Sequence, residues 1–191
     1  MAVQPDLDRE AVTAPPEVLV LTSSCREGSS TARLGGVVAQ ALRDAGRRAA
    51  LVHAGDLSLP WCTGAREQLE EPRVTAWREQ ARSTVAHVWV SAEWHGSMVG
   101  TLKNALDLLP VTDTQWKLVG LVAQAGGAMG AINALGHMRT VGQNLGTWVL
   151  PTQLSVSPDD LGPPLRPQIA ERLERFTREF DDAFTRLDRV M

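Results

Sequence analysis

Five short apolar runs, separated by segments with helical periodicity, constrain the fold of this chain more than any other feature. They are rich in Val, Leu and Ala, and they cover residues 18–21, 49–53, 85–91, 118–123 and 147–154. The first four are apolar almost without interruption, which is typical of strands covered on both faces of a sheet. The sequence therefore predicts five strands, four of them buried on both sides.

Apolar residues repeat every three or four positions in the segments between and after these runs, as they do on one face of a helix. Five helices are predicted in this way, with apolar stripes at residues 34–42, 74–81, 102–109, 135–145 and 169–187. Alternation of strand and helix implies parallel pairing through right-handed crossovers. We therefore expect an α/β fold, a doubly wound five-stranded parallel sheet in the order 2-1-3-4-5 with helices on both faces. Because Pro151 cannot donate a ladder hydrogen bond, the fifth strand is expected at an edge.

Composition excludes several classes of protein. A chain with 43% hydrophobic residues is not disordered, and no apolar run approaches the roughly 20 residues that cross a bilayer. The net charge of -3 argues against a nucleic-acid surface. Two cysteines without metal-type spacing, and an acidic start unlike a signal peptide, favour a cytoplasmic protein with no metal site. We expect one domain, 16–191, preceded by a flexible tail, 1–15.

In a sheet of this order, ligands bind beyond the carboxyl ends of the strands, where the strand order reverses. That point lies between the first and third strands, so the loops after residues 21, 90 and 123 are the candidates. The first of these loops, TSSCREGSST at 22–31, carries hydroxyl groups, an arginine and the start of a helix. Such groups suit a phosphate, and the residues expected to hold it are Ser24, Arg26, Ser29, Ser30 and Thr31.

The same loop allows a simpler interpretation, in which a Ser or Thr caps the helix and Arg26 is solvated. The position of the loop at the switch point favours the anion site. The loop has neither the G-K-[ST] triplet of a nucleoside-triphosphate site nor the G-x-G-x-x-G of a dinucleotide site. No histidine lies near Cys25 in the sequence, so we interpret this residue as a spacer and not as a nucleophile.

The loop after the third strand combines a large aromatic side chain, a glycine and polar groups, which suits a flat ligand. Its candidate residues are Glu93, Trp94, His95, Gly96 and Ser97. A lone histidine in a loop is more often a hydrogen-bond donor than a general base, so we give His95 no catalytic role. Lys103 and Asp107, four residues apart on the next helix, are expected to form a weak surface pair.

Three loops together resemble the motifs of the NAD(P)H-dependent FMN reductase family, a branch of the flavodoxin-like fold. The first, Ser23-Ser-Cys-Arg-Glu-Gly-Ser-Ser-Thr31, is similar to G-S-x-R-x-x-S-x-N. The second, 92–97 followed by 100–107, is similar to P-E-Y-N-x-S and G-x-L-K-N-A-x-D. The third, 123–130, falls where the family has a small glycine-rich loop. The resemblance covers about residues 16–157.

The resemblance implies FMN as the cofactor of the flavodoxin-like domain. By position, Ser24, Arg26, Ser29 and Thr31 would hold the phosphate, and residues 93–97 would contact the isoalloxazine ring. The pyrimidine edge of the ring would be closed by Gln124, Gly126 and Gly127. Ser23 and Thr31 replace a glycine and an asparagine of the family motif, and both suit a phosphate. The motif around the ring also differs, because Ala92, Trp94 and His95 stand where the family has Pro, Tyr and Asn.

The resemblance further implies an oxidoreductase that passes hydride from NADPH or NADH, through bound FMN, to a flavin, a quinone or an azo compound. This chemistry is assigned to N5 of FMN, and no catalytic residue is assigned. Trp61 and Trp94 are candidate walls of a slot for the flat acceptor, and the family's habit predicts a homodimer or homotetramer. Two alternatives remain open: an FMN-dependent dehydrogenase acting on a small biosynthetic intermediate, and an electron carrier without turnover.

Overall fold

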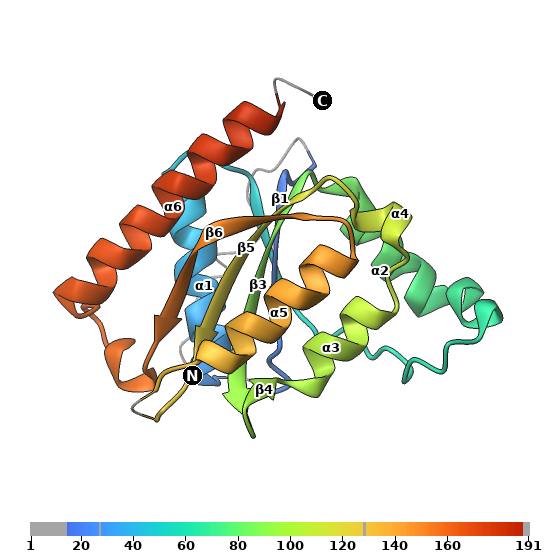
Figure 1. The fold of residues 1–191 in the computed structure, drawn as a ribbon, viewed down its shortest axis with the longest axis horizontal. Helices are drawn as coiled ribbons and strands as arrows, with labels where there is room; N and C mark the ends of the chain where they lie inside the picture. Colours follow the sequence, from blue (N-terminus) through green and yellow to red (C-terminus); the bar gives the residue numbers. More distant parts are fainter. Residues whose placement is uncertain (1–14, 27, 128, 189–191) are drawn as a thin grey trace, which may run out of the picture.

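The computed structural model describes residues 15–26, 28–127 and 129–188, and within them a parallel sheet forms the centre of the molecule (Figure 1). Its strands are β1 (Val18–Thr22), β2 (Ala49–His53), β3 (Ala86–Trp94), β5 (Leu118–Gln124) and β6 (Trp148–Val156), in the order β2-β1-β3-β5-β6. The predicted doubly wound order is thereby confirmed. Residues 1–14 of the predicted tail lie outside the described residues.

A sixth, short strand interrupts the segment that the sequence analysis treated as a loop. β4 (Ser97–Met98) pairs antiparallel with the end of β3, so that Trp94 lies opposite Ser97. The two residues between them, His95 and Gly96, have φ angles of 50° and 73°. A two-residue hairpin turn with positive φ at both positions matches the twist of the strands it joins. Residues 92–98 are therefore a hairpin and not a loop.

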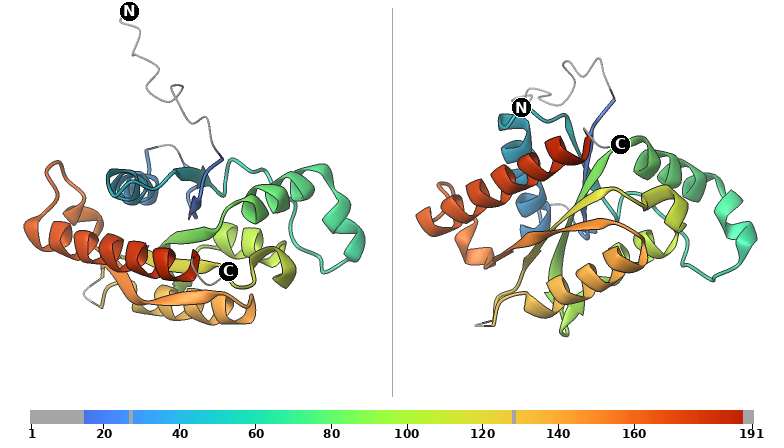
Figure 2. Two further views of the ribbon diagram at one scale, coloured as in Figure 1. Left: turned by 90° about the horizontal axis from the view of Figure 1, so that it is seen from above. Right: turned by 45° about the horizontal axis from the view of Figure 1, so that its top comes forward.

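Helices cover both faces of the sheet, as predicted (Figures 1 and 2). One face carries α1 (Ser30–Asp44) and α6 (Pro167–Asp188), whose apolar residues form one hydrophobic core. The other face carries α2 (Pro72–Ser83), α3 (Gly100–Asp107) and α5 (Ile132–Asn144), which enclose a second core. The short elements α4 (Val111–Thr114), η1 (Arg66–Glu70) and η2 (Pro158–Asp160) lie in the connections and were not predicted.

Alternation along β1 explains why both cores form on one sheet. Val18 and Val20 belong to the core under α1 and α6, whereas Leu19 and Leu21 belong to the opposite core. At the end of β1, helix α1 approaches closely because residue 35 is glycine. A Cβ added to Gly35 would lie 2.2 Å from Cγ2 of Thr22. This close packing places the first turn of α1 at the carboxyl end of β1.

The predicted edge position of β6 is also confirmed. The pairing of β6 with β5 is irregular around Pro151. Val119 of β5 pairs with Val149, but Leu121 pairs with Gln153, so the register shifts between them. Such an irregularity accommodates a residue that has no N–H to donate. Nearby, Nη2 of Arg139 donates to the carbonyl of Leu150 at 2.8 Å.

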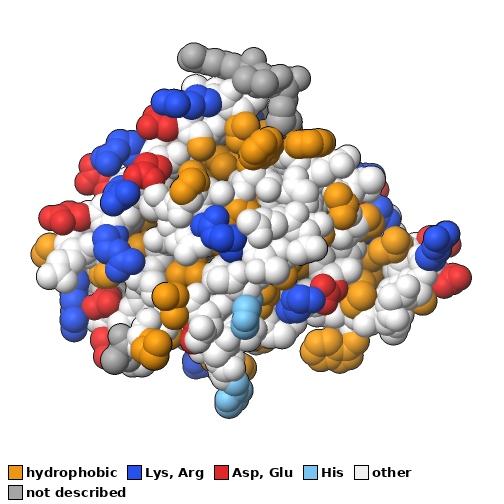
Figure 3. Space-filling view, viewed as in Figure 1, with side chains coloured by type: hydrophobic (Ala, Val, Ile, Leu, Met, Phe, Trp, Pro, Cys, Tyr) orange, Lys and Arg blue, Asp and Glu red, His pale blue; other side chains and the backbone are white. Residues whose placement is uncertain are grey.

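Charged side chains of both signs are mixed along α6, on the left of Figure 3, so this face has no patch of a single sign. The interspersed charges agree with the small net charge of -3. Among the described residues, no helix combines the length and the apolar composition needed to cross a membrane.

Candidate functional site

A cleft of about 470 Å³ opens at the carboxyl ends of β1, β3 and β5, where the sequence analysis placed the ligand. Three of the loops examined in the sequence contribute to it. Seven of the predicted site residues line the cleft: Ser24, Arg26, Ser29, Ser30, Thr31, Trp94 and Gln124. Side chains from elements about 90 residues apart in sequence thus share one cavity because the strands that carry them are neighbours in the sheet.

The hydroxyl-rich loop contains both a helix cap and an open cationic position. Oγ of Ser29 accepts a hydrogen bond from the amide of Ala32 at 3.0 Å and lies 2.6 Å from Oγ of Ser24. Ser29 is therefore the N-cap of α1, and Ser24 braces it. Arg26, in contrast, is exposed, and no described residue forms an ion pair with its guanidinium group. The cap interpretation thus explains Ser29 but leaves the role of Arg26 open.

Gln124, the last residue of β5, joins this loop from the side. Its side chain is 4% exposed, and its Nε2 donates to Oγ of Ser30 at 2.6 Å and to Oγ1 of Thr31 at 2.9 Å. Its Oε1 is buried and has no hydrogen-bond partner among the described residues. A buried acceptor without a donor costs about 1–3 kcal/mol, so this oxygen is a position where a ligand donor is favoured.

The hairpin of β3 and β4 directs most of its polar side chains away from the cleft. The carboxylate of Glu93 accepts from the amide of Ala134 at 2.9 Å, in the first turn of α5. The residue before this helix, Ala131, offers no side-chain cap, so Glu93 supplies one from another element. Oγ of Ser97 lies 2.9 Å from Nδ1 of His137, also on α5.

Of the predicted site residues 93–97, only Trp94 lines the cleft, and its side chain is 65% exposed. His95 and Gly96 form the turn at the tip of the hairpin. Gly126 and Gly127 follow β5, and a Cβ at either position would meet no atom within 4 Å. Neither the turn residues nor these glycines line the cleft, so their contacts with a ligand remain predictions.

Several lining residues were not assigned a site role from the sequence. They are Ser23, Cys25, Ala92, Val99, Gly100 and Thr101. Oγ1 of Thr101 donates to the carbonyl of Ser23 at 2.7 Å, which ties the first turn of α3 to the loop after β1. In the sequence, the resemblance of residues 100–107 to a family motif marked this segment. It did not show that the side chain of Thr101 bonds to the loop after β1.

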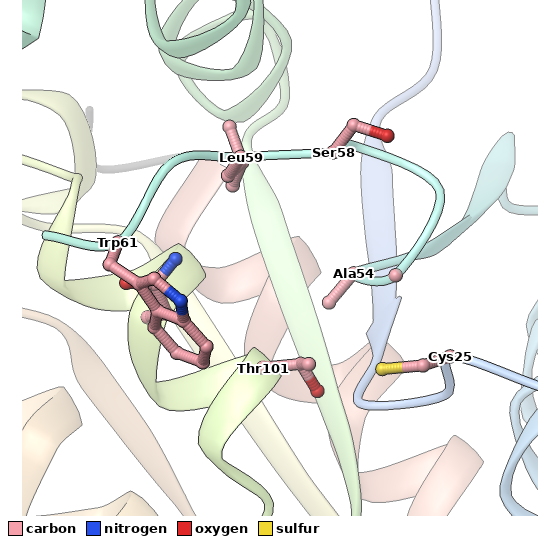
Figure 4. A pocket seen from close by; sticks show the side chains of 8 residues that line it. Cys25, Ala54, Ser58, Leu59, Trp61 and Thr101 are labelled. Atoms are coloured by element: carbon pink, nitrogen blue, oxygen red, sulfur yellow. The ribbon is translucent and has the colours of Figure 1, made fainter.

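A second, smaller cavity of about 180 Å³ adjoins the cleft and shares Cys25, Trp61 and Thr101 with it (Figure 4). Its far side is formed by the segment that follows β2. There the backbone of Gly55 packs on the loop after β1, so that a Cβ at this position would lie 2.5 Å from Cα of Cys25. Sγ of Cys25 contacts the carbonyl of Ser23 at 3.7 Å, and its interpretation as a spacer stays a prediction.

The strongest change of a pKa in the described residues lies outside the cleft. Burial lowers the pKa of His87 to about 4, and its Nε2 lies 3.0 Å from both the carbonyl of Ala81 and Oγ1 of Thr84. These groups lie near the amino end of β3, opposite the cleft. Burial also lowers the pKa of Lys117, which begins the approach to β5 at the same end of the sheet.

Comparison with known proteins agrees with the geometry. The model of the family described as NADPH-dependent FMN reductase matches residues 16–160. The chain is 31% identical over 147 residues to the NADPH-dependent FMN reductase ArsH of Acidithiobacillus ferrooxidans, an alignment that covers 74% of this chain and 60% of that protein. It is 36% identical over 83 residues to the FMN-dependent NADPH-azoreductase of Staphylococcus saprophyticus, covering 44% of each protein. The chain thus spans at most about 60% of the length of these first relatives.

Solved structures show the same fold at lower identity. FerB, a flavoenzyme NAD(P)H:(acceptor) oxidoreductase from Paracoccus denitrificans, superposes with a TM-score of 0.75 at 18% identity, covering 90% of this chain and 98% of that one. A flavodoxin from Pseudomonas aeruginosa superposes with a TM-score of 0.57 at 15% identity, covering 86% of this chain and 98% of that one. The flavodoxin-like fold predicted from the sequence is thereby confirmed.

Proposed function

The chain belongs to the NADPH-dependent FMN reductase family, and we propose that it is an FMN-dependent oxidoreductase that uses NADPH or NADH as its electron donor. The observation that carries this proposal is the arrangement around the first turn of α1. Hydroxyl groups, an exposed arginine and a buried amide oxygen with no donor in the described part of the chain meet there in one cleft. Each of these groups has a counterpart in FMN.

The phosphate of FMN fits the loop after β1. The first amides of a helix have no partner within the helix and carry the positive end of its dipole, which favours an anion. Ser30 begins α1, and Arg26 lines the same cleft. Arg26 supplies a fixed charge that no described carboxylate neutralises, and a charge-assisted hydrogen bond to a phosphate would use it.

The remainder of FMN fits the rest of the cleft. Oε1 of Gln124 can accept a hydrogen bond from a ligand N–H or hydroxyl group, and FMN has both kinds of donor. Trp61 and Trp94 stand at the rim of the cleft, where their indoles can border a flat ring. The volume of about 470 Å³ lies within the usual range for small-molecule sites.

FMN, when bound, supplies the redox chemistry, since it can take a hydride from a nicotinamide nucleotide and pass the electrons on. The net reaction with a quinone transfers two electrons and one proton from NADPH, takes the second proton from water, and yields NADP⁺ and a hydroquinone. The residues of this chain would bind and orient the ligands. No side chain is required to move a proton at the cleft.

We propose a flat acceptor, a quinone, an azo compound or a free flavin, because the rim of the cleft is aromatic and its outer side is open to solvent. We also propose that the protein works as a homodimer or homotetramer, which sedimentation velocity can measure. The dehydrogenase and carrier alternatives predict different behaviour toward nicotinamide nucleotides, so one experiment separates them from the reductase.

The test is an absorption spectrum of the protein after FMN has been added and unbound FMN removed, followed by NADPH or NADH without oxygen. The reductase should retain a flavin band that either nucleotide bleaches within seconds. A retained band that neither nucleotide bleaches would favour the dehydrogenase or the carrier. A protein that retains no flavin would show that the loop after β1 is only a turn and a helix cap.

A further inference from the structure

Trp61 is an exposed aromatic residue whose backbone is nevertheless held firmly. Its side chain is 73% exposed, and it lies in residues 58–65, which have no regular secondary structure. An irregular segment with an exposed indole gains little stability from burial. Leu59 of this segment packs against the second core, whereas the residues around Trp61 are held by hydrogen bonds.

Two side-chain amides hold the backbone on both sides of Trp61. Nδ2 of Asn104 donates to the carbonyl of Pro60 at 2.9 Å, and Oδ1 of the same residue accepts from the amide of Cys62 at 2.8 Å. Nε2 of Gln68 donates to the carbonyl of Trp61 itself at 2.6 Å. The three bonds fix the three consecutive residues 60–62.

Asn104 lies inside α3, where asparagine is a poorer helix former than alanine. Asparagine in such a position often bonds to the backbone of its own helix. Here both ends of its amide bond instead to the segment 60–62. The residue therefore weakens its own helix and organises a segment that lies more than 40 residues away in the sequence.

The indole held in this way stands on the boundary between two cavities. Trp61 lines both the main cleft of about 470 Å³ and the adjoining cavity of about 180 Å³. In Figure 4, Trp61 and Cys25 lie on opposite sides of the smaller cavity, with Thr101 between them and Ala54 and Leu59 along its wall. A flat ring that reaches from the main cleft into the smaller cavity would border both the indole and the apolar side chains of Ala54 and Leu59.

On the basis of the proposed function, we propose that Asn104 is a positioning residue that acts through Trp61. Together with Gln68, it holds the indole where a flat acceptor of two fused rings can stack, with the second ring in the smaller cavity. Acceptors with two fused rings are therefore preferred over those with one. Asn104 also lines the smaller cavity, but both ends of its amide are bonded to the backbone of residues 60 and 62, so we assign its effect to the position of the indole.

The test compares Asn104→Ala, Trp61→Ala and the double variant with the wild-type protein, all loaded with FMN. Lys103→Gln is the matched control, since Lys103 lies on the same helix but pairs outward with Asp107. The electron acceptors are dimethyl naphthoquinone and tetramethyl benzoquinone. Both are fully substituted on the quinone ring, so neither can add to the exposed thiols of Cys25 and Cys62.

Two readouts do not depend on turnover. Calorimetry measures the Kd of naphthol and phenol, a two-ring and a one-ring compound that do not accept electrons. Hydrogen exchange measures the protection of the Cys62 amide, which donates to Asn104 in the wild-type protein. Flavin content is measured for each variant, because the Kd and KM values are meaningful only at equal loading.

We expect Asn104→Ala to retain FMN, to speed exchange at Cys62, and to raise the Kd of naphthol and the KM of the naphthoquinone about threefold to tenfold. The kcat and the values for the one-ring compounds should change by less than about twofold. Trp61→Ala should have at least as large an effect. Adding Asn104→Ala to Trp61→Ala should have no further effect on naphthol binding, because Asn104 acts through the indole.

Two results would overturn the inference alone. One is wild-type binding of naphthol by Asn104→Ala even though exchange at Cys62 is faster. The other is an undiminished effect of Asn104→Ala in the Trp61→Ala background. A wild-type protein that retains no FMN, or retains FMN that neither nucleotide reduces, would instead overturn the proposed function and this inference with it.

Discussion

Replacement of Arg26 by alanine tests the proposed phosphate site most directly, because the side chain can be removed without changing the hydrogen bonds of the loop backbone. The backbone of Arg26 is part of the loop: its carbonyl accepts from Oγ of Ser24 at 3.0 Å and from the amide of Ser29 at 3.2 Å. Alanine preserves these bonds. The guanidinium group forms no ion pair with a described residue, so its removal should leave the loop intact.

The expected effect on FMN binding follows from the strength of a charge-assisted hydrogen bond. Such a bond contributes about 1.5–3 kcal/mol, which corresponds to a factor of about 10 to 150 in Kd. Because Arg26 is exposed and water screens its charge, we expect the lower part of this range, about 10- to 30-fold. The midpoint of thermal unfolding of the protein without FMN should change by no more than about 2 °C.

The assay is a titration of FMN fluorescence at two salt concentrations, together with thermal unfolding of the protein without FMN. Arg33→Ala is the matched control, since Arg33 is also an exposed arginine, lies on α1, and does not line the cleft. The difference between the two variants should shrink at high salt, because it arises from charge. Equal Kd values for the two variants, or a large loss of thermal stability in Arg26→Ala, would refute the reasoning.

Three further predictions concern the stability of the protein without FMN, measured by urea unfolding. Glu93→Ala should lower the free energy of unfolding by about 0.5–2 kcal/mol, because α5 loses the carboxylate that caps it; an unchanged value would mean that this cap is redundant. Gly35→Ala should lower the free energy of unfolding by about 1–2 kcal/mol, because the added Cβ would overlap the side chain of Thr22. Gly36→Ala should raise it by about 0.5–1 kcal/mol, because a Cβ there meets no atom within 4 Å and alanine is the better helix former. Equal changes in the free energy of unfolding for the two variants would contradict the close packing of α1 on β1. Burial lowers the pKa of His87 from 6.5 to about 4, so the unfolded chain binds more protons between these values, and stability should fall by roughly 3 kcal/mol as the pH falls from about 6.5 to 4. This dependence should be nearly flat in His87→Gln, and a persisting slope of the same size would assign it to other groups.

The order of the strands was predictable because it depends on patterns that are local in the sequence. Each apolar run became a strand within a few residues of its predicted bounds, and the fifth strand lies at the edge, where Pro151 is tolerated. The hydroxyl-rich loop at the start of α1 was predictable for the same reason. A strand end, a turn and a helix cap are all encoded within the ten residues 22–31.

The contacts made by the side chains of the hairpin were less predictable than the place of this segment after the third strand. The strand was expected to end at residue 91, but the positive φ angles of His95 and Gly96 continue it into a hairpin. The turn sets which residues face the cleft and which face α5. Trp94 faces the cleft, whereas Glu93 and Ser97 bond to α5. Their partners lie about 40 residues later in the chain, so no local pattern reveals them.

The sequence by itself determined the α/β fold, the strand order and the position of the hydroxyl-rich loop, because hydrophobic periodicity and helix caps act between residues close in the chain. Only the tertiary structure decided how individual side chains are used. It left Oε1 of Gln124 without a donor among the described residues, turned Glu93 onto α5, and placed Asn104 against the segment that carries Trp61. A hydrogen bond forms only when two groups meet within about 3 Å in the right direction, and that depends on how distant elements pack.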